Sequence, residues 1–108
     1  MVLTPHCRQI TLTTGGQSYN LYALLAAIDA ELPKLVKYLA VQSDPSNGAA
    51  TLGCGNKSTA GAFLQGASLV ASQVWILPAI DAGEYNLNNI WLQGSSNSML
   101  VNVTATPR

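Results

Sequence analysis

The sequence predicts a mainly β protein, a single-domain antiparallel β-sandwich that is jelly-roll-like, with one short α-helix near the N-terminus. Beyond Gly48, short apolar stretches alternate with Gly, Ser and Asn about every ten residues, which is typical of a sandwich. Before Gly48, apolar residues follow helical spacing in one segment. The length of 108 residues fits one domain spanning residues 1–108, of which residues 1–8 can form an extended arm.

The first part of the chain is predicted to form a strand and then a helix. Residues Arg8–Thr14 alternate between apolar and polar, which indicates a half-buried strand. Tyr19–Ile28 places its leucines at helical spacing, with Asn20 available as the N-cap. A further helical turn is predicted at Pro33–Val36, because the first position of a helix does not need the N–H that proline lacks.

Alternation resumes at Lys37–Gln42, which predicts a strand that buries either Leu39 and Val41 or Tyr38 and Ala40. The residues Asp44–Gly48 predict a turn, because proline presets φ, Asp and Asn bond to nearby backbone, and glycine accepts a positive φ. Further strands are predicted at Ala50–Cys54, Ala62–Leu64, Ser68–Ala71, Gln73–Leu77, Asn89–Gln93 and Met99–Thr104, with loops at Asp81–Asn88 and Gly94–Ser98.

Charge is scarce in this chain: five Lys or Arg residues balance five Asp or Glu residues. A soluble domain usually has about a quarter of its residues charged. The basic residues are scattered singly, so we expect no nucleic-acid partner. The longest apolar run, Leu21–Ile28, has eight residues, too few to cross a membrane, and Met1–Arg8 lacks the pattern of a signal peptide. We therefore expect no membrane partner.

The motifs that could carry chemistry each lack a required residue. Gly53–Thr59 resembles a phosphate loop, but Asn56 stands where glycine must precede the lysine. His6 and Cys7 are neighbours in an extended segment and point to opposite sides, so they cannot form a catalytic dyad. A pair of His6 with Cys54 stays geometrically open. We expect no enzyme, cofactor or metal site.

Cysteines and acidic residues are assigned structural or solvent roles. Cys7 and Cys54 match no zinc spacing and are expected to be two buried free thiols, with a single disulfide between them as the open alternative. Asp29 and Glu31, close together after the predicted helix, are expected to be solvated.

Two strands are apolar on both faces, which is unusual for an antiparallel strand with one face in water. They are Val74–Leu77 and Ile90–Leu92, and Met99–Val101 is similar. Either the helix or a loop covers the second face, or another chain does, and the low charge favours a homo-oligomer. The candidate core or interface residues are Trp75, Leu77, Tyr85, Trp91 and Met99. The aromatic residues also allow a sugar-stacking platform, so a small carbohydrate-binding module is an alternative.

The order of segments resembles that of small structural proteins of tailed bacteriophage particles. The segments are Gln9–Thr14, Tyr19–Asp29, Tyr38–Gly48, Asn89–Gly94 and Leu100–Thr104, so the resemblance covers residues 9–104. It consists of strand-and-turn rhythm and includes no chemical signature. The sequence departs from the pattern at Gly55–Lys57, where related chains carry an acidic, glycine-led turn.

The resemblance implies a virion component without catalytic activity, present in many copies, such as a capsid decoration or cement protein. Its implied partners are the major capsid protein or other virion proteins, and copies of itself. Its implied location is the virion, assembled in the host cytoplasm. A neck or tail protein of the virion is the alternative position.

Overall fold

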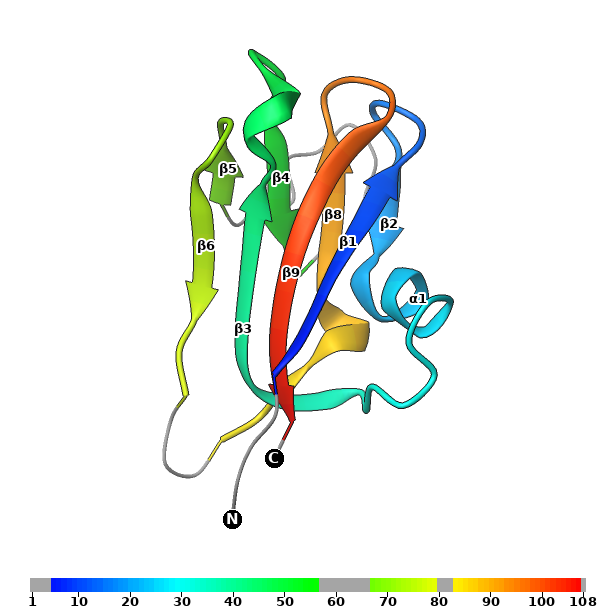
Figure 1. The fold of residues 1–108 in the computed structure, drawn as a ribbon, viewed down its shortest axis with the longest axis vertical. Helices are drawn as coiled ribbons and strands as arrows, with labels where there is room; N and C mark the ends of the chain where they lie inside the picture. The colour runs from blue at the N-terminus through cyan, green and yellow to red at the C-terminus, as the bar shows by residue number, and fades with distance from the viewer. Residues whose placement is uncertain (1–4, 57–66, 80–82, 108) are drawn as a thin grey trace.

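Two antiparallel sheets pack face to face in the computed structural model, which describes residues 5–56, 67–79 and 83–107 (Figure 1). Sheet A contains β1 (His6–Leu12), β9 (Met99–Pro107), β3 (Leu35–Ser43) and β6 (Val74–Leu77) in that order, and the short β7 (Tyr85–Asn86) also pairs with β3. Sheet B contains β2 (Ser18–Asn20), β8 (Trp91–Gly94), β4 (Leu52–Gly55) and β5 (Ala67–Leu69) in that order. The predicted β-sandwich is confirmed.

The path of the chain between the sheets is that of a jelly roll. Successive strands pass from sheet A to sheet B and back, except that β4 and β5 are neighbours in sheet B and β7 joins sheet A beside β3. As a result β1 and β9, from opposite ends of the chain, pair over their whole common length from His6–Ala105 to Leu12–Met99. In Figure 1 these two strands lie side by side, with β1 at one edge of sheet A and β9 between β1 and β3.

The core lies between the sheets and consists of aliphatic side chains. Leu39 and Val41 are fully buried, so the first of the two predicted registers for this strand is correct, and Tyr38 and Ala40 point outward. The largest fully buried side chains are Leu12, Leu21, Leu25, Leu39, Leu52, Leu87, Leu92, Val36, Val41, Val101 and Val103. Burial of this apolar surface is the main stabilising contribution to the fold.

The single helix α1 (Leu21–Ala26) is shorter than predicted. Asn20 caps it as expected, since its side chain accepts a hydrogen bond of 3.0 Å from the Ala23 backbone N–H. Tyr19 and Asn20 instead belong to β2, where they pair with β8. The predicted turn at Pro33–Val36 is wrong, because β3 begins at Leu35. An isolated helical turn gains one hydrogen bond, whereas a strand in this place gains pairing with β7 and β9.

Other differences concern the short elements and the arm. β7 and the 3₁₀ turn η2 (Leu87–Asn89) replace most of the predicted loop at residues 81–88, of which 81–82 lie outside the described residues. The proposed arm is wrong for His6–Arg8, which pair with β9. The predicted strand Ala62–Leu64 lies outside the described residues. The turn at residues 44–48 is confirmed: Asp44 caps the 3₁₀ turn η1 (Pro45–Asn47), and Gly48 has φ of 63°.

Candidate functional site

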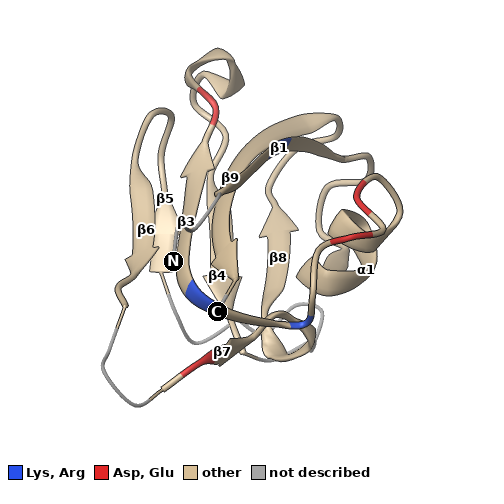
Figure 2. Cartoon of the chain, turned by 60° about the horizontal axis from the view of Figure 1, so that its bottom comes forward, with Lys and Arg blue, Asp and Glu red and all other residues tan. Residues whose placement is uncertain are grey.

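Between its two ends, the outward face of sheet A carries no charged side chain; Lys37 lies at the irregularity near the start of β3, and Asp44 follows the end of that strand. We call this surface the neutral face. The alternation of buried and outward residues and the strand register assign it two main rows, Gln9–Asn102–Gln42–Val74 and Cys7–Thr104–Ala40–Ile76, extended by Thr11, Leu100, Tyr38 and Thr106. Of the two basic residues in these strands, Arg8 binds Asp29 and Lys37 lies at an irregularity of β3. Figure 2 shows how few Lys, Arg, Asp and Glu residues lie on the described part of the chain.

A row of amide side chains crosses the neutral face. The Gln9 amide donates a hydrogen bond of 2.9 Å to Asn102, and the Asn102 amide donates to Gln42 at 3.1 Å and to Asp44 at 2.9 Å. Gln42 in turn donates to the Ser72 carbonyl at 3.2 Å. Hydrogen bonds donated by Ser46 and Asn102 lower the pKa of Asp44, which keeps this acceptor ionised. These hydrogen bonds hold the amide side chains of the row in one orientation in the free protein.

The strand β6 forms one edge of sheet A and displays apolar side chains to solvent. Val74 is 45% exposed and Ile76 is 51% exposed. Both point away from the core, and β6 contains neither a charged residue nor a proline, which are the usual protections of an exposed strand edge. The exposed Val74 and Ile76 therefore form the apolar border of the neutral face along β6.

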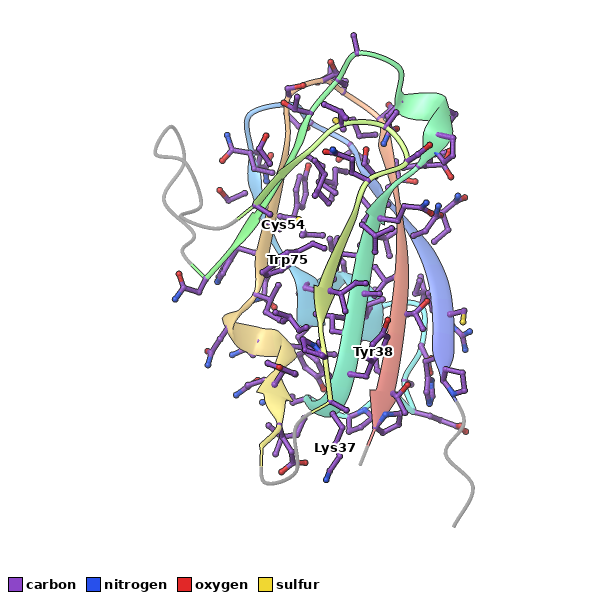
Figure 3. All side chains as sticks on the ribbon, turned by 90° about the vertical axis from the view of Figure 1, so that its left-hand side faces the viewer. Lys37, Tyr38, Cys54 and Trp75 are labelled. Carbon is purple, nitrogen blue, oxygen red and sulfur yellow. The ribbon has the colours of Figure 1, made fainter. Side chains whose placement is uncertain are left out.

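A pocket of about 380 Å³ lies where the two sheets separate beside β6. Its lining residues are Gly55, Asn56, Trp75, Leu77, Glu84, Tyr85, Asn86, Asn89 and Ile90. Trp75 and Leu77 alternate with the outward Val74 and Ile76, so they face inward. Figure 3 shows Trp75 extending from β6 toward the side of the molecule where Cys54 lies on β4. The Tyr85 hydroxyl donates to the Pro78 carbonyl at 2.8 Å, which fixes the phenol ring.

The five residues singled out in the sequence do not form one cluster. Trp75, Leu77 and Tyr85 come together at the pocket. Met99 is buried in the core. Trp91 is half-buried on β8, where it pairs with Gly55 of β4. Its neighbour Leu92 points into the core, so Trp91 points to the outer face of sheet B. The exposed Val74 and Ile76 were not among these five residues. The sequence did contain a sign of their exposure, because β6 is apolar on both of its faces.

Asp29 is the buried centre of an ionic cluster with the half-buried His6 and the exposed Arg8. Its carboxylate accepts from His6 Nδ1 at 2.7 Å and lies 3.0 Å from the Arg8 guanidinium, and its other oxygen accepts from the Glu31 backbone N–H. The hydrogen bond from His6, followed by the charge of Arg8, lowers the pKa of Asp29. The expectation that Asp29 is solvated is wrong, since only 7% of it is exposed.

The His6–Asp29 pair does not include a nucleophile of the kind considered from the sequence. Cys54 is buried on β4 in sheet B, and burial raises the pKa of its thiol to about 12. Such a thiol is inert at neutral pH. Cys7 is exposed, so the expectation of two buried thiols is correct for Cys54 and wrong for Cys7, and both thiols are free.

The described residues contain no group of three His, Cys, Asp or Glu side chains arranged to hold a metal ion. In the same residues, no helix combines the length and the apolar character needed to cross a bilayer.

Comparisons of the chain with protein-family models, with curated proteins and with solved structures found no match.

Proposed function

We propose that this chain is a non-enzymatic structural component of a tailed bacteriophage virion, most simply a capsid decoration protein. In this proposal the neutral face of sheet A docks on the shell formed by the major capsid protein. Many copies, each binding neighbouring shell subunits, hold those subunits together through multivalent contacts. The bacteriophage assignment rests on the resemblance of the segment order, and the docking role rests on the surface described above.

The observation that carries the docking role is the uncharged, apolar-edged surface of sheet A. The cores of protein interfaces are depleted in charged residues, because desolvating an unpaired charge is costly. Here the half-exposed Val74 and Ile76 can be buried, and the Gln9, Gln42 and Asn102 amides already satisfy part of one another's hydrogen bonding. A partner can therefore cover the middle of this surface without burying an unpaired charge, and the Asp44 carboxylate at its edge already accepts hydrogen bonds from Ser46 and Asn102.

The scarcity of charge elsewhere supports the same proposal. A net charge of zero at pH 7 gives no long-range repulsion between copies on a crowded shell. Jelly rolls also occur in viral capsid domains, although the same fold serves lectins, so the fold supports the proposal only by analogy.

A substitution at β6 tests the docking role on purified particles. Ile76→Lys removes an apolar side chain from the proposed interface and adds a charge that must be desolvated. Losing a buried isoleucine alone costs about 1.5 kcal/mol or more, which corresponds to about a tenfold weaker affinity. We expect mass spectrometry of particles produced with this variant to show strongly reduced occupancy after dilution.

Ile28→Lys is the matched control, since Ile28 is 53% exposed and follows α1, on the opposite side of the molecule from β6 (Figure 1). Its occupancy should equal that of the unmodified chain. Equal occupancy for both variants would refute docking through β6, and absence of the unmodified chain from the particles would refute the virion role itself.

A further inference from the structure

We propose that the pocket beside β6 binds a neutral saccharide. This inference goes beyond the structural role and does not depend on it, because the pocket lies between the sheets while the neutral face points outward. At about 380 Å³ the pocket is in the size range of small-molecule sites, and it combines apolar walls with a few polar groups.

The walls of the pocket provide flat apolar surfaces. Trp75 on β6 and Tyr85 on β7 place an indole and a phenol along the same pocket, and Leu77 and Ile90 add aliphatic surface. The C–H faces of a pyranose ring are apolar and stack on such rings, whereas its hydroxyls need polar partners at the edge. Because the Tyr85 hydroxyl is held by the Pro78 carbonyl, its ring is already ordered for such a contact.

Three asparagines supply the polar partners. The side chains of Asn56 and Asn89 are solvent-exposed and make no hydrogen bond within the described part of the chain, so both amides are available to a ligand. The oxygen of Asn86 accepts from the Asn88 backbone N–H at 2.9 Å, which leaves its NH₂ group to donate. An amide both donates and accepts, which matches the hydroxyl groups of a sugar.

The charge of the pocket argues for a neutral ligand. Glu84 is an acidic lining residue, and the described lining includes no Lys, Arg or His. A phosphate, sulfate or uronic acid is best held by basic side chains, and the described lining residues include none. A simple cation would leave the three amides without a role.

Fluorescence can detect ligands at Trp75. The chain has two tryptophans, so Trp91→Phe leaves Trp75 as the single indole reporter. We expect a saturable change in its emission when the variant is titrated to ~50 mM with glucose, galactose, mannose, N-acetylglucosamine or their disaccharides. Nuclear magnetic resonance of the unmodified protein provides an independent readout, in which the Trp75 indole and the Asn56, Asn86 and Asn89 amide signals should shift with the same sugar.

Asn89→Ala should weaken binding of that sugar about fivefold, the effect of one lost hydrogen bond. Asn88→Ala is the matched control, because Asn88 is its neighbour in η2 and does not line the pocket. The proposal is overturned if no sugar in the panel shifts these signals, or if choline or glucuronate binds and neutral sugars do not. Occupancy on particles should be unchanged in Asn89→Ala, so either proposal can fail without the other.

Discussion

Among individual residues, the buried Asp29 connects two segments of the chain through its ion pairs and hydrogen bonds. It joins the start of β1, through His6 and Arg8, to the segment that follows α1. A buried carboxylate is tolerated because it is both ion-paired and hydrogen-bonded. The sequence places Asp29 near the end of a helix, where acids are usually solvated, and could not show that His6, 23 positions away, would bond to it.

The lowered pKa of Asp29 predicts a specific dependence of stability on pH. A carboxyl group whose pKa is lower in the folded state stabilises the fold above its unfolded pKa of about 4, and this contribution is lost as pH falls through the folded pKa. Asp29→Asn should therefore lower the free energy of unfolding at pH 7, and the difference from the unmodified chain should shrink below about pH 4.

Urea denaturation at several pH values measures this difference. Glu31→Gln is the control, because Glu31 is exposed and contributes only its backbone N–H to the cluster. A deficit for Asp29→Asn that stays constant down to acid pH would contradict the ionic explanation.

Among the elements, η1 depends on a contact that no local pattern reveals. The Asn47 side chain donates to the Leu100 carbonyl at 2.8 Å and accepts from the Leu100 N–H at 3.0 Å, so it pairs with β9 as a neighbouring strand would. Its amide also donates to the buried Ser43 hydroxyl at 3.0 Å. The sequence predicts the turn from Asp44, Pro45 and Gly48, whereas the partner of Asn47 lies 53 residues away.

Removal of this amide should destabilise the fold. In Asn47→Ala the Leu100 N–H loses its partner, and a half-buried polar group without one costs about 1–3 kcal/mol. The free energy of unfolding from urea denaturation should fall by that amount. Ser46→Ala, in the same turn but exposed, should have a smaller effect, and equal losses in the two variants would contradict the role given to Asn47.

The strands themselves were largely predictable, and the exceptions have a common cause. β1 and β3 follow from alternation, because each buries one face against the core, whereas β6 and β9 were predicted from short apolar stretches between turn residues. β2 and β7 have only three and two residues, too few to show any period, and exist through pairing with β8 and β3. The pocket could not be predicted from the sequence either. Trp75 and Tyr85 were recognised there as candidate residues, but only the fold brings them close to Asn56.

At the scale of the whole molecule, the jelly roll and the shortage of charge combine to produce one broad uncharged surface. The contacts of such a surface are apolar or between neutral groups, so salt should screen little of their energy. We expect occupancy on purified particles to be unchanged within about twofold between ~0.1 M and ~1 M sodium chloride. Release of the chain at the higher concentration would show that ion pairs, and not the neutral face, hold it.

The most direct test of the central claim is a cryo-electron microscopy reconstruction of the particle that carries this chain. We predict that the strand rows Gln9–Asn102–Gln42–Val74 and Cys7–Thr104–Ala40–Ile76 contact the shell. A reconstruction in which the chain is bound but sheet A faces solvent would contradict the account.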